Sequence, residues 1–332
     1  STLVPAKTYD TEEEDIYVIN NAGGSNGGYG YVRLKKVTGP PEDPEIVDIG
    51  LSGVPEPWSN SSQVSAGNFA PQLDSDERIK TVDARMENMV DRNGKLWAAH
   101  QVYLPAGNNP QRSAIQWWNL STDGEVLQWG RVDDPDGGMF FAFASIAVNA
   151  MEDVLIGFGS FREAQYARSS YAMRYAEDPP NTLREYYQYR DGEAPYFKTF
   201  GADRNRWGDY TSTFVDPEDD LDFWTLQEYA AMPAGVQDEW GTWWAYLDMH
   251  AVPEADFTSN IDEVPVNSGV DFYDQSKYNP DTWLWTFEGG TPSTSVEQNP
   301  QNIIYNEPGM YDVTLIATNG EGSNMLVMEN FI

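Results

Sequence analysis

Short runs of β-favouring residues fill the chain, and Gly, Pro, Asn or Asp ends most of them. Such runs are typical of strands, whereas the apolar spacing of an amphipathic helix is scarce. The 28 Gly and 21 Pro residues match a fold with many turns. Residues 178–190 contain helix-favouring side chains, but Pro179-Pro180 and several Tyr residues favour a loop followed by a strand. The sequence therefore predicts an all-β protein.

The chain carries a large excess of negative charge. Its 332 residues include 53 Asp and Glu against 20 Lys and Arg, which gives a net charge of -33 at pH 7. This field repels nucleic acid and anionic lipid, so we expect neither as a partner. No run approaches the roughly 18 apolar residues of a membrane span, so we expect no direct membrane insertion.

The scarcity of Cys and His restricts the chemistry that the chain can perform. It has no Cys and two His residues, His100 and His250, so a disulfide, a thiol nucleophile and a Cys-ligated zinc are excluded. His100 follows an apolar run on a predicted strand, and we interpret it as a hydrogen-bonded core residue. We interpret His250 as structural, because it lies near the expected domain junction.

Three segments repeat one pattern: a β-favouring residue, an Asp or Asn, a polar turn and an apolar strand. They are Val90–Trp97, Val148–Gly157 and Val215–Trp224, and they start 58 and 67 residues apart. The pattern predicts hairpins in which the Asp or Asn side chain caps the turn. For residues 1–251 we prefer a β-propeller of about five blades with long loops. Whether its N-terminus is truncated stays undecided at this point. Three ordinary hairpins in a sandwich are the alternative.

Residues 113–246 resemble a family of secreted bacterial propellers related in shape to the sialidase/BNR-repeat superfamily. The stretches that carry the resemblance are Ser113–Trp118, Phe143–Asn149, Asn205–Tyr210 and Trp240–Trp243. The resemblance implies a β-propeller. A sialidase Asp-box reads Ser-x-Asp-x-Gly-x-Thr-Trp, and the nearest segment, Ser121–Gly124, has another spacing. This difference counts against sialidase activity.

Residues 252–332 carry a second set of motifs. They are Ala255–Phe257, Trp283–Gly290, Gln298–Pro300 and Pro308–Leu315. Together they resemble a PKD domain, which implies an immunoglobulin-like β-sandwich. Such domains serve as spacers or ligand-binding accessories on secreted enzymes and adhesins. The alternation of a strand places Trp283 and Trp285 on one face and Leu284 on the other.

The densest cluster of polar and aromatic residues lies at positions 203–210. We expect it to line the mouth of the propeller and to bind a ligand. The candidate binding residues are Arg204, Arg206, Trp207, Asp209 and Tyr210. An Arg guanidinium binds a carboxylate or sulfate with two hydrogen bonds, and a Trp ring stacks on a sugar.

Two alternatives apply to the same cluster. In the first, Arg206 pairs with Asp209 and Trp207 fills the interface between two blades, so that the segment is structural. In the second, Asp209 is an acid/base and Tyr210 a nucleophile of a glycoside hydrolase. Such an enzyme needs two carboxylates about 5 Å or about 6.5–9.5 Å apart. Asp209, Glu228 and Glu239 are the acids nearest to aromatic residues, but with 53 acids abundance is not evidence.

Acidic turns suggest calcium as a cofactor. The candidate ligands are Asp216, Asp219, Asp220 and Asp222, and a second acidic run spans Asp133–Gly137. Carboxylate oxygens in turns suit calcium, although neither run fits the spacing of an EF-hand. Solvated turns without a metal are the alternative.

Two Trp pairs, Trp117-Trp118 and Trp243-Trp244, each place neighbouring rings on opposite faces of a strand. We expect one ring of a pair to be exposed, and we favour packing between blades over sugar binding for the Trp residues as a group.

These observations predict a bacterial protein that is secreted or at the cell surface. The leading function is non-catalytic binding or adhesion, with a glycan or a surface protein as the ligand. A sialidase-like or polysaccharide-degrading glycoside hydrolase is the first alternative. A structural component of a larger surface assembly is the second.

Overall fold

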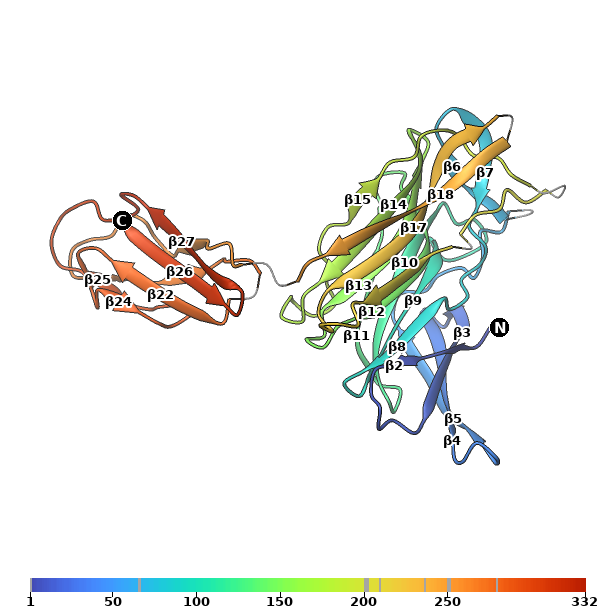
Figure 1. Ribbon diagram of the computed structural model, residues 1–332, viewed down its shortest axis with the longest axis horizontal. Coiled ribbons are helices and arrows are strands. Elements are labelled where there is room, and N and C mark those ends of the chain that lie inside the picture. The colour runs from blue at the N-terminus through green and yellow to red at the C-terminus, as the bar shows by residue number, and fades with distance from the viewer. Residues whose placement is uncertain are drawn as a thin grey trace. The chain divides into compact units, whose positions relative to one another are not determined.

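The computed structural model describes residues 2–64, 67–199, 203–208, 210–235, 237–249, 252–278 and 280–332. The chain divides into two compact units, Ser1–Leu247 and Asp248–Ile332 (Figure 1). All the extended regular elements in the described residues are β-strands, which confirms the all-β prediction. The described part of the chain contains no membrane-spanning helix.

Four sheets form most of the first unit, and their strands are antiparallel except for one parallel pair. The first sheet has the order β1 (Val4–Pro5), β3 (Ile16–Asn26), β4 (Tyr29–Thr38), β5 (Glu45–Val54). The second has the order β11 (Val126–Val132), β10 (Arg112–Ser121), β9 (Lys95–Leu104), β8 (Asn88–Arg92), β2 (Lys7–Thr8), with β2 parallel to β8. The third runs β12 (Phe140–Val148), β13 (Val154–Arg162), β14 (Gln165–Arg174), β15 (Tyr187–Arg190). The fourth runs β16 (Ser212–Val215), β17 (Phe223–Ala234), β18 (Gln237–Leu247).

A separate hairpin, β6 (Asn68–Gln72) and β7 (Ser75–Lys80), completes this unit. The strand β15 follows a loop at residues 178–186, which confirms the loop and strand predicted there.

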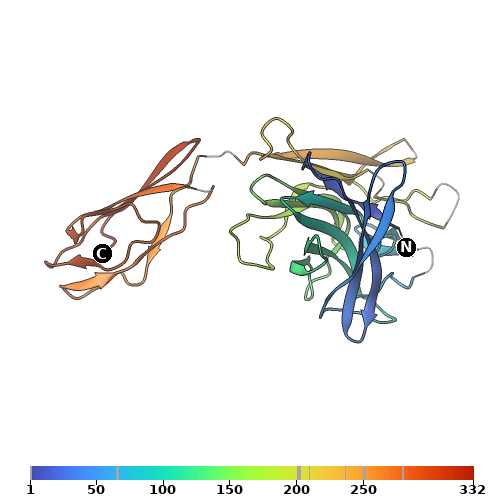
Figure 2. The same cartoon turned by 90° about the horizontal axis from the view of Figure 1, so that it is seen from below.

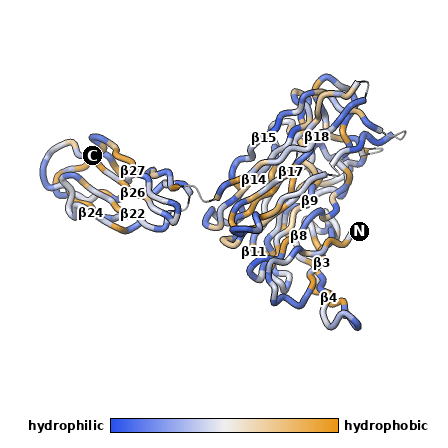
Figure 3. The backbone as a smooth tube through the Cα atoms, viewed as in Figure 1, coloured by the Kyte–Doolittle hydropathy of each residue, from blue (hydrophilic) through white to orange (hydrophobic). Residues whose placement is uncertain are grey.

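The four sheets pack against one another in chain order. Strands of the first sheet contact those of the second, β9 and β10 contact β12, and β14 contacts β17 (Figures 1 and 2). Apolar residues lie mainly along the strands and hydrophilic residues mainly in the loops (Figure 3). The second and third sheets therefore lie inside the stack and are covered on both faces, which explains their nearly continuous apolar strands.

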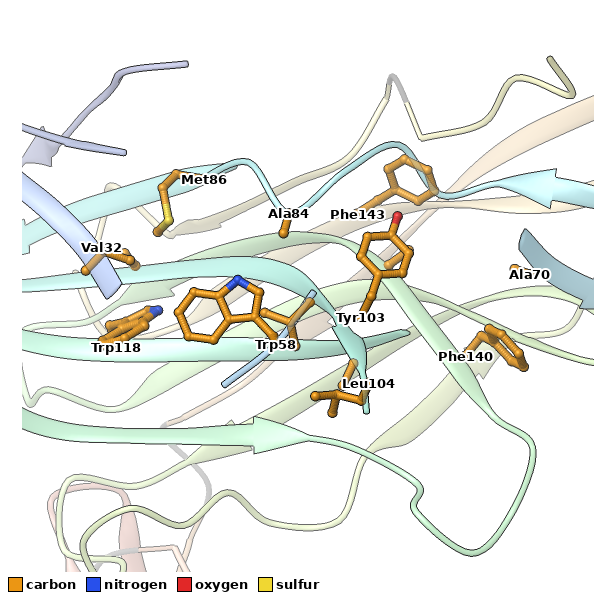
Figure 4. Close-up of a cluster of buried hydrophobic side chains, with 14 of the residues drawn as sticks. Val32, Trp58, Ala70, Ala84, Met86, Tyr103, Leu104, Trp118, Phe140 and Phe143 are labelled. Carbon is orange, nitrogen blue, oxygen red and sulfur yellow. The ribbon is translucent and has the colours of Figure 1, made fainter. Parts of the chain in front are cut away.

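Two hydrophobic cores result from this packing. Figure 4 shows part of the first, in which Trp58 lies 6.0 Å from Trp118 between ring centroids. The second contains Trp97 and Trp117, whose rings stack 6.3 Å apart. Both rings of the pair Trp117-Trp118 are fully buried, so the expectation of one exposed ring is wrong here. Each face of β10 meets a core because the second sheet is covered on both sides.

The three repeated segments are hairpins at equivalent places in three successive sheets. They join β8 to β9, β12 to β13 and β16 to β17, which confirms the predicted strand-turn-strand pattern. Asn93 and Gly94 both have positive φ in the first turn. In the second, Asn149 Oδ1 accepts hydrogen bonds from two backbone N–H groups at 3.0 and 2.9 Å. In the third, Asp216 Oδ1 accepts from the Glu218 N–H at 2.9 Å.

These three turns bind one another, and we call them the turn row. Asn93 Nδ2 donates to the Ala150 carbonyl at 3.2 Å, and Asn149 Nδ2 donates to the Leu221 carbonyl at 2.9 Å. An ion pair between Arg92 and Asp220 connects the first turn to the third. The turn row therefore fixes the second, third and fourth sheets to one another at one end.

None of these sheets closes on itself in the described residues, and the propeller of about five blades is not confirmed. It stays a prediction for the first unit.

In its described residues, the second unit contains nine short strands in three sheets. The first sheet pairs β19 (Phe257–Ser259) with β21 (Phe272–Asp274). The next has the order β20 (Ser268–Val270), β25 (Ile303–Tyr305), β23 (Gly290–Thr291). The last has the order β24 (Thr294–Ser295), β22 (Thr282–Phe287), β26 (Val313–Asn319), β27 (Gly322–Met328). Trp285 is fully buried in the core and Trp283 packs against it, whereas Leu284 is exposed, as the alternation predicts.

Candidate functional site

The cluster singled out from the sequence borders a pocket of about 260 Å³ in the first unit. The pocket is lined by Tyr196, Arg206, Trp207, Gly208, Tyr210, Glu228 and Trp240. Its walls come from two sources: described residues of the segments 196–199, 203–208 and 210, which contain no helix or strand, and the outer face of the fourth sheet. Three of the five predicted binding residues therefore lie together. We call this cavity the Tyr210 pocket.

Glu228 fixes the loop that forms one wall. This residue lies on β17 and is almost fully buried. Its Oε2 accepts a hydrogen bond from the Gly208 N–H and its Oε1 accepts one from the Tyr210 N–H, both at 2.9 Å. A carboxylate bonded to backbone N–H groups makes strong, charge-assisted bonds. Glu228 therefore positions the backbone of the loop.

Gly208 lets the same loop lie against the third sheet. Its φ is +90°, and a Cβ at this position would lie 2.0 Å from the ring of Phe143. Phe143 itself has φ +62° and lies at a bulge in β12. The close approach requires a residue without a side chain.

Trp207 has a structural role beside its place in the pocket wall. Its ring makes edge contacts with Tyr196 at 5.0 Å and with Phe161 at 6.0 Å, and it belongs to the first core. The structural alternative for Trp207 is thus compatible with a pocket, because one edge of the ring packs inward while the residue also borders the cavity.

Tyr210 and Trp240 form an aromatic pair in the lining of the pocket. Their rings are stacked, with centroids 5.8 Å apart and an interplanar angle of 5°. Tyr210 is 54% exposed. The Lys198 Nζ lies 4.6 Å from the centre of the Trp240 ring and pairs with Glu239 at 3.2 Å. The pocket therefore offers a flat aromatic surface with cations at its border.

Arg204 lies outside the lining and contributes to a positively charged corner. Burial lowers the pKa of Lys80, and the positive charges of Arg204 and Arg206 lower it further. Lys80 and Arg204 thus lie near Arg206, which lines the pocket. Asp209 lies outside the described residues.

Four lining residues were not predicted as binding residues. They are Tyr196, Gly208, Glu228 and Trp240. Glu228 is the one charged residue of β17, and a lone charge in such a strand is a signal for a buried, bonded carboxylate. Tyr196 carries no comparable signal, because only the fold brings it to the pocket.

The predicted calcium ligands cap the third turn of the turn row. Asp216 Oδ2 accepts from the Trp224 indole at 2.8 Å, Asp219 Oδ1 accepts from the Leu221 N–H at 2.8 Å, and Asp222 accepts from the Tyr246 hydroxyl. In the described residues, no three His, Asp or Glu side chains converge as metal ligands would. This geometry favours the capped turn, and the calcium site stays a prediction.

His100 lies in the first core. Its ring contacts Trp58 and Trp118, and its Nδ1 lies 3.1 Å from the Ala84 carbonyl, to which the neutral ring donates. Burial lowers the pKa of His100 to about 4. The interpretation as a hydrogen-bonded core residue agrees with these contacts, and His250 lies outside the described residues.

Comparison with known families concerns the second unit. The model of the PKD domain matches residues 256–329. Residues 256–329 form a PKD domain. PKD domains are typically extracellular modules of adhesion and structural proteins, where they mediate protein or surface interactions in larger assemblies. The resemblance predicted for residues 252–332 is thereby confirmed.

No family model supports the resemblance of the first unit to sialidase-like propellers. No curated protein matches the chain. A crystal structure of a protein of unknown function from Dyadobacter fermentans has 10% sequence identity and a TM-score of 0.31. The alignment covers 97% of this chain and 92% of that chain. At this TM-score the likeness carries no argument.

Proposed function

We propose that the chain is a bacterial extracellular binding protein that recognises a glycan through the Tyr210 pocket. The observation that carries the proposal is the exposed Tyr210 ring, which stacks on the half-buried Trp240 in a pocket that Arg206 also lines. A flat aromatic face attracts the C–H groups of a sugar ring, and a guanidinium donates to sugar hydroxyls or a carboxylate. The PKD domain supports a place outside the cell or on its surface.

Binding without catalysis is the form of this proposal that the pocket supports best. Among the described lining residues, Glu228 is the one carboxylate, and both its oxygens accept backbone N–H groups. Glycosidases use two carboxylates about 5 Å or about 6.5–9.5 Å apart. A hydrolase using Asp209 and Tyr210 is the alternative, and a structural role in a surface assembly is the third candidate.

Two features of the first unit support the propeller as a proposal. Its sheets pack in chain order, and equivalent hairpins lie at the same end of three of them. Both features are expected of blades.

The test is incubation of the protein with a mixed glycan library, with and without calcium, followed by mass spectrometry of the bound and free fractions. We expect the protein to retain intact glycans, and Tyr210→Ala to lose them. Tyr187→Ala is the matched control, because Tyr187 on β15 is 59% exposed and does not line the pocket. Shortened glycans would favour the hydrolase. A protein that retains and cleaves none would favour the structural role.

A further inference from the structure

Four aromatic residues lie close together at one end of the outer face of the fourth sheet. Phe214 pairs with Trp224, Trp224 pairs with Tyr246, and Leu226 beside them pairs with Trp244. We call Phe214, Trp224, Trp244 and Tyr246 the aromatic platform. Residues at alternate positions of β17, such as Thr225 and Gln227, are buried toward the third sheet. The platform therefore lies on the opposite face of the sheet.

The platform is exposed to an unusual degree. Trp244 is 59% exposed, Tyr246 44% and Phe214 38%. Single exposed apolar residues are common on protein surfaces, but a contiguous aromatic patch marks a binding surface.

Hydrogen bonds and ring contacts hold the platform in place. The Trp224 indole donates to Asp216 at 2.8 Å, and the Tyr246 hydroxyl donates to Asp222. The Trp224 ring lies 5.2 Å from that of Trp244 and 4.8 Å from that of Tyr246. A surface fixed before binding loses little entropy when a ligand arrives.

The platform continues the Tyr210 pocket. Further along the same face, Glu228 pairs with Thr242 and Ala230 pairs with Trp240, and Glu228 and Trp240 line the pocket. Trp240 and Trp244 are four residues apart on β18, a separation of about 13 Å along the strand. A ligand that covers both must be longer than one sugar ring.

The charge of the sheet indicates what kind of chain would bind. Strands β16, β17 and β18 contain no Lys or Arg, and the carboxylates of Asp216 and Asp222 lie beside the platform rings. This border accepts hydrogen bonds from hydroxyl groups but repels a chain of carboxylates or sulfates. A second copy of this chain would also be repelled, because each copy carries a net charge of -33.

We propose that the aromatic platform binds the uncharged sugars of an extended polysaccharide whose end or branch occupies the Tyr210 pocket. This proposal rests on the glycan-binding function proposed above and specifies its ligand as a neutral polymer. Sugar rings stack on Trp244 and on the ring cluster around Trp224. Their hydroxyl groups donate to the carboxylates beside them.

The test is native affinity electrophoresis of the full chain in gels that contain a neutral polysaccharide: xyloglucan, galactomannan or mixed-linkage β-glucan. Gels with alginate or polygalacturonate are the anionic counterparts. We expect retention in at least one neutral gel and free migration in the anionic gels. Calorimetric titration with oligosaccharides of increasing length, cut from the polymer that retains the protein, then measures affinity.

We expect Trp244→Ala to bind the longest oligosaccharide about tenfold more weakly, which corresponds to about 1.4 kcal/mol. The shortest oligosaccharide that fills the pocket should keep its affinity in this variant and lose it in Tyr210→Ala. Trp243→Ala is the matched control, because Trp243 is 46% exposed on the opposite face of the same strand. Thermal unfolding of each variant verifies that it is folded.

Different results would overturn the platform proposal, the neutral polymer and the proposed glycan-binding function. If Trp244→Ala binds long oligosaccharides as the wild type does, the platform proposal is overturned and the pocket proposal stands. Stronger retention in the anionic gels would overturn the neutral polymer. If light scattering shows a dimer that Trp244→Ala abolishes, the platform is a contact between copies. If the wild type binds no glycan at all, the proposed function itself is overturned.

Discussion

Gly208 shapes the candidate site because it has no side chain. At Gly208 the loop of the Tyr210 pocket passes over the ring of Phe143, where a Cβ would lie 2.0 Å from a ring carbon. The bulge that presents Phe143 is in turn held by Glu87, whose Oε2 accepts from the Ala144 N–H at 2.7 Å. The geometry of the pocket thus depends on Phe143 of the third sheet and on Glu87 in the segment before β8.

Gly208→Ala should destabilise the protein and abolish glycan binding. The left-handed backbone costs an L-residue about 1–2 kcal/mol, and the clash with Phe143 adds about 1–3 kcal/mol. Chemical denaturation and glycan retention measure the two effects. Gly235→Ala is the control, because Gly235 has φ +71° with open space around it and should show the backbone cost alone. Equal stability losses in the two variants would contradict the predicted clash.

Glu87 should make the stability depend on pH. Burial raises the pKa of Glu87 to about 8, so the folded state holds a proton that the unfolded chain releases near its ordinary pKa. The stabilisation that protonated Glu87 provides is complete below the pKa that Glu87 has in the unfolded chain. It is lost as the pH rises through about 8, the pKa of Glu87 in the folded protein. Glu87→Gln removes this loss of stability at high pH, because Gln does not titrate. Thermal unfolding between about pH 5 and about pH 9 should therefore show the variant gaining stability over the wild type as the pH rises. Glu42→Gln, in an exposed loop, should show no such trend.

At the scale of elements, the turn row connects three hairpins. The sequence pattern predicts each hairpin separately and gives no sign of the bonds between them. Asn149 is the central residue of the turn row. It is fully buried, caps its own turn through Oδ1 and donates to the Leu221 carbonyl in the turn between β16 and β17 of the next sheet. One side chain therefore stabilises both a hairpin and the packing of two sheets.

Asn149→Ala should lower the free energy of unfolding by about 3 kcal/mol, because it leaves several buried polar groups without partners. Urea unfolding measures the change. Asn26→Ala provides the comparison: Asn26 is exposed at the end of β3, and its loss should cost less than about 0.5 kcal/mol. Similar values for the two variants would show that the turn row contributes little.

The two Trp pairs show what period-two alternation can and cannot predict. Both rings of Trp117-Trp118 are buried because β10 is inside the stack, and both rings of Trp243-Trp244 are exposed because β18 is an edge strand. Alternation assigns each ring to a face of its strand. Whether that face is covered depends on the neighbouring sheets, which no local pattern specifies.

At the scale of the whole molecule, each unit has its own hydrophobic core. Independent cores predict two transitions in calorimetry, and a core substitution should shift only one of them. Trp285→Ala should destabilise the second unit by about 3–5 kcal/mol and leave the other transition unchanged. Leu284→Ala, on the exposed face of the same strand, is the control. A single transition that shifts as a whole would contradict independent folding.

The sequence predicts the parts of the molecule that depend on neighbouring residues. The PKD motifs, the three hairpins and the strand after residues 178–186 all lie within short segments, where alternation and turn chemistry decide the structure. The cluster at 203–210 predicts Arg206, Trp207 and Tyr210 in one site for the same reason. Tyr196 and Trp240 join them through sheet packing over longer separations, and this packing has no local signature.

The turn row also relates the fold to the direction in which the chain is made. Each hairpin of the row bonds to the one that precedes it in the sequence: residues 149–152 to Asn93, and Asp220 and Leu221 to residues 149 and 150. A nascent chain emerges from its N-terminus, and its early segments fold first. Each new hairpin thus finds its docking surface already made, so the sheets can assemble one by one during synthesis.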